Sequence, residues 1–182
     1  MIKLIMCCDL NGGIGYKGDL LYKIPQDMKM FKELTTGAGN YKNTVLMGYK
    51  TWESLNFKPL KYRNNVVFSR DLEKMFDSFG ILSEEESKRV FYSNDIRDIK
   101  NKYKLDHTRE NWIIGGSTLY NYCIQNKLAD EIYMTLVCDN TKEADTFVNM
   151  DNLIKNYQKD KEIMESYHNG LIYSILKLKV RK

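Results

Sequence analysis

Apolar residues in this chain gather in short runs, which glycine, proline and charged residues separate. The first run, over residues 1–9, is apolar on both faces, a pattern typical of a strand in the middle of a parallel or mixed sheet. The glycine-rich stretch that follows it is a poor candidate for helix or strand. Further apolar runs predict strands over residues 44–47, 64–69, 112–114 and 130–138.

Helical periodicity predicts a helix that begins at Pro25, because proline suits the first position of a helix, where its missing N–H is not needed. Glycines at Gly37 and Gly39 should end this helix. Its apolar face would be formed by Met28, Phe31 and Leu34.

Two other helices should follow strands directly. Gly48 breaks the strand over 44–47, and a short helix is predicted over 49–55. Ser117 is a suitable N-cap for another helix. The apolar positions of that helix are Leu119, Tyr120, Cys123 and Ile124.

Residues 71–110 are more polar and weakly patterned, and we expect surface elaboration there. The pattern predicts a helix over 83–88, a short strand over 90–92 and a helix over 95–103. Near the C-terminus, residues 163–167 and 171–178 flank His168-Asn169-Gly170, a hairpin signal with the usual Asn-Gly turn. The whole pattern predicts an α/β fold in a single domain over 1–182, with a mixed, mostly parallel central sheet flanked by helices and a C-terminal antiparallel hairpin.

Composition narrows the class of partner. The chain is 43% hydrophobic and 12% aromatic, values of a globular protein with a real core. Its formal charge of +4, from 28 basic and 24 acidic residues, is too small to indicate nucleic-acid binding. That charge suits an anionic small molecule held by a few fixed cations.

The four cysteines form no C-x-x-C pair, and the chain has only two histidines, His107 and His168, so no zinc site or other metal site is expected. Cys7 and Cys8 are neighbours on a strand and must point to opposite faces. Free thiols in a reducing compartment are the simplest interpretation. The apolar run over 4–8 is too short for a signal peptide or a membrane span, so we expect a cytoplasmic protein without membrane contact.

Several residues could carry chemistry, yet each also has an ordinary structural interpretation. Asp27 could be a buried ligand-binding carboxylate, although an acid near a helix start usually serves the helix dipole. Arg63 and Arg70 flank one strand and would usually be solvated charges. Thr135 lies inside an apolar strand, where threonine is commonly plain β-sheet filler.

The glycine-containing segments also have both a ligand-binding interpretation and an ordinary structural one. Residues 12–15 (Gly-Gly-Ile-Gly) lack the spacing of a dinucleotide fingerprint, and residues 48–51 (Gly-Tyr-Lys-Thr) lack that of a P-loop. A helix that begins directly after a strand still presents free N–H groups to an anion, so residues 48–51 could bind phosphate. Gly115-Gly116 would allow a phosphate or a flat ring to approach the backbone, or could be a simple turn.

Together these signals occur in one order: glycine-rich loop, Pro-x-Asp helix start, Met-Gly-x-x-Thr-Trp-Glu-Ser, Ser-Arg after a strand, and Gly-Gly before a helix. This order and spacing resemble the dihydrofolate reductase family. The resemblance is carried by residues 9–31, 45–54, 59–70 and 113–120, and by Thr135 and the segment 145–147. It spans nearly the whole chain, although residues 71–110 are longer and less family-like.

The resemblance implies that a dihydropterin receives a hydride at C6 and a proton at N5. Asp27 matches the carboxylate that accepts two N–H bonds from the pterin, Thr135 the hydroxyl that bonds this carboxylate, and a water would protonate N5. Arg63 matches the arginine that binds the glutamate part of dihydrofolate. Backbone groups of Ile5, Cys7 and Ile114 would meet the pterin or nicotinamide. The apolar walls would be formed by Met28, Phe31, Leu55 and Leu60.

The cofactor implied by the resemblance is NADPH. Ser69 and Arg70 match the group around its 2′-phosphate, and Asp145 matches a residue that braces a mobile cover. The cover matches residues 14–20, in which Ile14, Gly15 and Leu20 would contact the cofactor. One phosphate-binding turn would consist of Gly48, Tyr49, Lys50 and Thr51. The other would consist of Gly115, Gly116, Ser117, Thr118, Leu119 and Tyr120, with a cis Gly-Gly peptide.

Three residues depart from the family pattern. Tyr22 stands where tryptophan is most frequent, although a phenol can still bond a water beside the pterin. Tyr49 stands where an arginine commonly helps to hold the 2′-phosphate, so cofactor preference rests more on Arg70 and Lys50. Ser117 replaces a frequent third glycine.

The expected protein is a monomeric reductase with dihydrofolate as its substrate. Two alternatives stay open: a pyrimidine riboside reductase of the same fold, and a folate- or nucleotide-binding interaction module without turnover.

Overall fold

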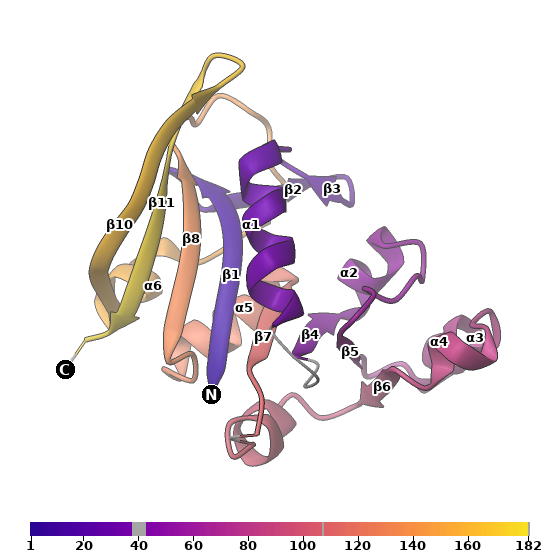
Figure 1. Cartoon of the computed structure of the whole chain (residues 1–182). Coiled ribbons are helices and arrows are strands. Elements are labelled where there is room, and N and C mark those ends of the chain that lie inside the picture. The colour runs from indigo at the N-terminus through magenta and orange to yellow at the C-terminus, as the bar shows by residue number, and fades with distance from the viewer. Residues whose placement is uncertain (38–42, 107, 182) are drawn as a thin grey trace.

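The computed structural model describes residues 1–37, 43–106 and 108–181. Its main feature is an eight-stranded sheet with the order β10-β11-β8-β1-β7-β4-β5-β6 (Figure 1). In this spatial order the strands are Tyr157–His168, Leu171–Val180, Glu131–Val137, Ile2–Asp9, Asn111–Gly115, Thr44–Gly48, Asn64–Phe68 and Val90–Ser93. All neighbours from β8 to β6 pair in parallel, while β11 pairs antiparallel with both β8 and β10. The predicted fold class is therefore confirmed.

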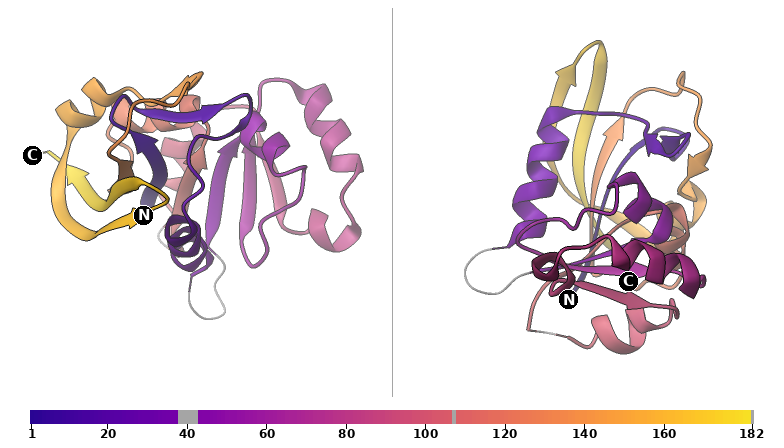
Figure 2. Two further views of the ribbon diagram at one scale, coloured as in Figure 1. Left: turned by 90° about the horizontal axis from the view of Figure 1, so that it is seen from above. Right: turned by 90° about the vertical axis from the view of Figure 1, so that its right-hand side faces the viewer.

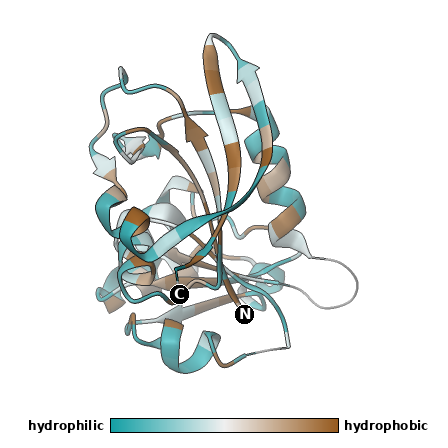
Figure 3. Ribbon diagram, turned by 90° about the vertical axis from the view of Figure 1, so that its left-hand side faces the viewer, coloured by the Kyte–Doolittle hydropathy of each residue, from teal (hydrophilic) through white to brown (hydrophobic). Residues whose placement is uncertain are grey.

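Strand β1 lies in the middle of this sheet, as its apolar pattern predicted. It pairs in parallel with β7 on one side and with β8 on the other, where Cys7 lies opposite Thr135. Its side chains alternate between the two faces, so Ile5 belongs to one apolar cluster and Cys8 to another. Figure 3 shows hydrophobic segments along the strands of the sheet.

The helices cover both faces of the sheet (Figures 1 and 2). Helices α1 (Pro25–Thr36) and α2 (Tyr49–Ser54) pack on the face that carries Ile5. Helices α5 (Ser117–Gln125) and α6 (Met150–Asn156) and the π-helix η1 (Ile99–Tyr103) pack on the face that carries Cys8. Pro25 begins α1, as predicted, but the predicted end at Gly39 lies outside the described residues. No helix of the described part has the length and apolar character needed to cross a bilayer.

Two local predictions were wrong. The glycine-rich loop contains β2 (Gly13–Tyr16) and β3 (Asp19–Leu20), which form a small sheet with β9 (Thr146–Phe147). Gly116, not Ser117, precedes the first residue of α5, and no side chain caps that helix. The short strand predicted over 90–92 is confirmed as β6, so residues 71–110 add an edge strand to the main sheet as well as surface elements.

Residues 71–110 also contain α3 (Leu72–Gly80), which the pattern did not predict, and the predicted short helix α4 (Glu84–Ser87). The carboxylate of Asp71 caps α3 by accepting a hydrogen bond from the Lys74 N–H. Helix η1 is shorter than the predicted helix over 95–103.

The C-terminal hairpin is confirmed. Strands β10 and β11 pair antiparallel from Tyr157–Val180 to His168–Leu171. At the turn, Asn169 and Gly170 both have positive φ, at 48° and 87°, the geometry for which Asn-Gly is favoured.

Candidate active site

Asp27 lies in the first turn of α1 and faces the sheet. Its residue is only 8% exposed, and the hydroxyl of Thr135 donates a hydrogen bond of 2.6 Å to its Oδ1. Thr135 is fully buried on β8, opposite Cys7 of β1. The chain therefore brings together a helix start and the two central strands around one carboxylate. A solvated helix-dipole acid does not fit this burial.

Burial raises the pKa of Asp27 above its ordinary value, and the hydrogen bond from Thr135 opposes that increase. The neighbouring Cys7 is affected too, because burial, and after it the charge of Asp27, raises the pKa of its thiol. The ionised carboxylate is thus held in an environment that opposes its charge. Such groups are common where a charged or hydrogen-bonding ligand completes the site.

This raised pKa predicts an unusual stability effect for Asp27→Asn. When a carboxyl has a higher pKa folded than unfolded, its contribution to stability is complete below the unfolded value, 3.8, and is lost as pH rises through the folded value. Without ligand, Asp27→Asn should therefore be at least as stable as the native protein at pH 7. In urea unfolding over a pH series, the difference in unfolding free energy between the variant and the native protein should become smaller as the pH falls toward 3.8. An Asn variant that is less stable at pH 7, with a deficit that grows with pH, would contradict the assigned burial cost.

Tyr120 connects α5 to the same central strand. Its hydroxyl donates a hydrogen bond of 2.7 Å to the carbonyl of Ile5, and burial, followed by the charge of Asp27, raises the pKa of this phenol. Tyr120 was expected near the cofactor. The structure places its hydroxyl on the backbone group of β1 that was expected to meet the pterin or nicotinamide.

The expected apolar wall residues gather on the α1 and α2 face of the sheet. Phe31, Leu55, Leu60 and Ile114 pack against the cluster that contains Ile5, whereas Met28 is 47% exposed. Arg63 is buried and donates through Nη1 to the hydroxyl of Thr35 at 2.8 Å. The Arg63 guanidinium carbon lies 5.9 Å from the centre of the Phe31 ring. Arg63 is therefore not a solvated charge, and it adjoins the apolar wall.

The two glycine turns lie against each other at the ends of β4 and β7. The peptide between Gly115 and Gly116 is cis, as the resemblance implied. A Cβ on Gly115 would lie 2.9 Å from Oγ1 of Thr51, and a Cβ on Gly48 would lie 3.5 Å from the Gly116 nitrogen. Residues Ser117, Thr118 and Leu119 begin α5 directly after this turn. Small residues thus leave two adjacent helix starts open, which suits the phosphates of a dinucleotide.

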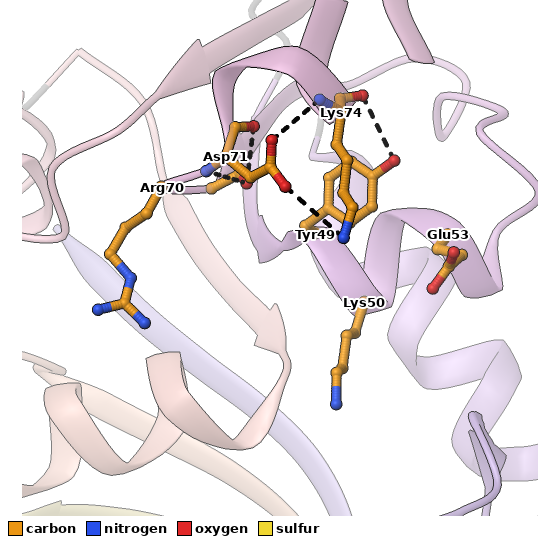
Figure 4. A pocket seen from close by; sticks show the side chains of 7 residues that line it. Tyr49, Lys50, Glu53, Arg70, Asp71 and Lys74 are labelled. Carbon is orange, nitrogen blue, oxygen red and sulfur yellow. Dashed lines mark hydrogen bonds and ion pairs between the residues drawn. The ribbon is translucent and has the colours of Figure 1, made fainter. Parts of the chain in front are cut away.

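A pocket of about 520 Å³ lies beside α2 and the start of α3 (Figure 4). Among the expected cofactor residues it collects Tyr49, Lys50, Ser69 and Arg70. Its other lining residues, Glu53, Asp71 and Lys74, were not expected to bind the cofactor. The pocket is therefore at the expected 2′-phosphate position rather than at Asp27.

Tyr22 has partners that the sequence did not reveal. It is 3% exposed, and its hydroxyl donates to Oδ2 of Asp139 at 3.1 Å. The ammonium of Lys142 lies 4.5 Å from the centre of its ring. Burial and the hydrogen bond to Asp139 raise the pKa of the Tyr22 phenol. Asp139 and Lys142 lie 117 and 120 positions along the chain, so no local pattern could have indicated these contacts.

The expected cover contacts the loop before β9. The Lys17 N–H donates to Oδ2 of Asp145 at 2.8 Å, and the Asp145 N–H donates to the carbonyl of Gly15 at 3.1 Å. Ile14 is half-buried, and Leu20 is 52% exposed. Asp145 therefore contacts the backbone of this loop at two points.

Comparisons with known proteins show the family of this chain. A family model described as Dihydrofolate reductase matches residues 1–179. The Dihydrofolate reductase of Ureaplasma parvum serovar 3 is 30% identical over 172 residues, which cover 94% of both proteins. The Bifunctional dihydrofolate reductase-thymidylate synthase of Paramecium tetraurelia is 30% identical over 171 residues, or 94% of this chain, but the match spans only 33% of that relative.

A solved structure shows the same fold. Dihydrofolate reductase from Enterococcus faecalis, complexed with NADP(H) and RAB-propyl, superposes with a TM-score of 0.77 at 22% identity. The match covers 100% of this chain and 97% of the other. The fold and the matched relatives define the class of this protein as an oxidoreductase of mixed α/β architecture. Within that class, the chain belongs to the dihydrofolate reductase family.

Proposed function

We propose that the chain reduces 7,8-dihydrofolate to 5,6,7,8-tetrahydrofolate with NADPH, and so supports one-carbon and thymidylate metabolism. The observation that carries this proposal is the buried Asp27–Thr135 pair, which lies at the head of α1 beside the central strands. Family membership supports the same reaction.

Asp27 would hold the pterin. An ionised carboxylate has lone pairs for several hydrogen bonds, and Thr135 uses only one at Oδ1. The carboxylate can therefore accept two N–H bonds, from the 2-amino group and the adjacent ring nitrogen, as a bidentate charge-assisted pair. These bonds would offset the cost of burying the charge. Asp27 thus orients the ring and stabilises positive charge on it, while a water delivers the proton to N5.

Other residues would fix the remaining parts of the ligands. Phe31, Leu55 and Leu60 supply an apolar wall, and the Arg63 guanidinium beside Phe31 suits the glutamate carboxylate. The turns at 48–51 and 115–120 would hold the dinucleotide phosphates. When bound, NADPH supplies the hydride that adds to C6 of the pterin.

Arg70→Ala should weaken NADPH binding far more than NADH binding. Arg70 lines the pocket with Ser69 and Lys50, and only NADPH carries a 2′-phosphate to meet its guanidinium. Fluorescence titration with each cofactor measures the two dissociation constants. Arg97→Ala is the control, because Arg97 is an exposed arginine paired with Asp95 outside the pocket lining. Equal weakening of both cofactors would remove Arg70 from the 2′-phosphate site.

We also propose that the chain acts as a single domain and a monomer in the cytoplasm, without nucleic acid. Its four cysteines are free thiols, which fits a reducing compartment. Light scattering on the purified protein tests the monomer, with a mass of 21.4 kDa expected.

A steady-state assay tests the proposed function. Purified protein with dihydrofolate and NADPH should oxidise NADPH, whereas a pyrimidine riboside of the kind reduced in riboflavin synthesis should leave it unchanged. Binding of both ligands without oxidation would favour a non-catalytic module. Oxidation with the riboside alone would favour the other reductase.

A further inference from the structure

We infer that Lys74 is a third cation for the cofactor 2′-phosphate and that Tyr49 positions it, an inference that rests on the proposed use of NADPH. Lys74 belongs to α3, an element that the sequence pattern did not predict, and it lines the pocket with Lys50 and Arg70. Figure 4 shows contacts joining Asp71, Lys74 and Tyr49, while Lys50 and Arg70 extend away from that group.

The charged residues of the pocket lining favour a role for a third cation. Lys50 and Arg70 are offset by two acids in the same lining, Glu53 and Asp71, so these four residues carry no net charge. A phosphate monoester carries about −1.5 to −2 charges at pH 7 and gains from charge-assisted hydrogen bonds. Lys74 adds one positive charge, which makes the lining net positive.

The Lys74 ammonium can leave its present partner, Asp71, to bind a phosphate. Its Nζ lies 3.6 Å from Oδ2 of Asp71, and the two side chains are 65% and 47% exposed. An exposed pair at that distance contributes little, so a phosphate can replace the carboxylate as the partner of Lys74. Asp71 meanwhile fixes the first turn of α3, from which Lys74 extends, because its Oδ1 accepts the backbone N–H of Lys74 at 3.1 Å.

Tyr49 fixes the backbone from which this side chain extends. Its hydroxyl donates to the Lys74 carbonyl at 3.4 Å, and its ring lies 6.1 Å from that of Phe57. This contact joins α2, which carries Lys50, to α3, which carries Lys74. Tyr49 therefore contributes as a positioning residue for a cation supplied by the next helix.

The inference predicts that Lys74→Met raises the NADPH dissociation constant about tenfold, the scale of one charge-assisted contact. The NADH dissociation constant should change less than twofold. The salt dependence of NADPH binding should also decrease, because one phosphate contact is lost. Tyr49→Phe should shift NADPH in the same direction by a smaller factor.

Titration of the purified protein with NADPH, NADH and adenosine 2′-monophosphate at two salt concentrations measures these effects without turnover. Lys88→Met is the matched control, because Lys88 is similarly exposed, at 62%, and pairs with acids outside the pocket lining. A Lys74→Met protein with unchanged NADPH affinity, or with equal losses for NADPH and NADH, would overturn the inference. A native protein that binds NADPH selectively but does not reduce dihydrofolate would defeat the proposed function alone.

Discussion

Asp27→Asn is expected to lower kcat/KM for dihydrofolate by at least about 10²-fold, the scale of losing one preorganised electrostatic group. The amide has nearly the shape of the carboxylate and can still accept the hydrogen bond from Thr135. It has no charge, however, and its NH₂ group would face N–H donors of the pterin. The loss should therefore appear in the reaction while the fold is kept.

Steady-state NADPH oxidation measures this effect, with Asp160→Asn as the control. Asp160 is an exposed acid on β10 that pairs with Lys179, so its neutralisation changes the net charge equally without touching the site. The same Asp27→Asn protein should be at least as stable as the native one at pH 7. Near-normal turnover would show that Asp27 does not orient the pterin. A variant that fails to fold would contradict the destabilisation assigned to the buried, ionised carboxylate.

The second large effect is expected for Gly12→Ala, at the base of the glycine-rich loop. A Cβ there would lie 2.4 Å from the backbone oxygen of Val148 and 2.9 Å from Cγ of Met150. The same backbone is joined by a hydrogen bond of 2.8 Å from the Val148 N–H to the Gly12 carbonyl. The methyl group would force this loop away from the segment after β9.

Gly18→Ala is the matched control for this change. Gly18 has nearly the same φ, +84° against +81°, but its Cβ would meet nothing within 4 Å. Both variants should lose about 1–2 kcal/mol because alanine disfavours positive φ. Gly12→Ala should lose about 1–3 kcal/mol more through overpacking. Urea unfolding measures the free energy of unfolding of both variants. Equal losses would show that the loop and Val148 can move apart without a cost in stability.

The elements predicted from the sequence are those whose signals are local. The apolar run of β1, the proline at the start of α1 and the Asn-Gly turn of the hairpin each act within a few residues. Strands β2 and β9 were missed because their pairing joins segments about 130 positions apart, with only short apolar runs at either. Helix α3 also carries local signals, a cap at Asp71 and apolar residues at Leu72, Met75, Phe76 and Phe79, but they were missed because the surrounding residues 71–110 are mostly polar.

In the candidate site, motif order indicated some residues but not those whose position depends on elements that the sequence did not reveal. Asp27 and Thr135 were proposed from a resemblance in motif order, and the structure brings them together across 108 positions. Lys74 was not proposed, because its place in the pocket depends on α3. The bond from Tyr22 to Asp139 depends on a loop that follows β8, whose path no motif indicates.

The raised pKa of Asp27 joins stability to function in this chain. The fold buries a carboxylate whose ionised form it disfavours and provides one hydroxyl as partial compensation. A ligand that supplies two further N–H donors would complete the hydrogen bonding of this group. The site is therefore expected to be destabilising without ligand and strongly stabilised by its substrate.

A crystal structure of the chain with NADP⁺ and folate would test the central proposal most directly. We expect the two carboxylate oxygens of Asp27 to lie about 2.7–3.1 Å from the pterin 2-amino group and the adjacent ring nitrogen. Thr135 should keep its bond to Oδ1. A pterin bound elsewhere, with Asp27 still bonded to Thr135 alone, would contradict the proposal.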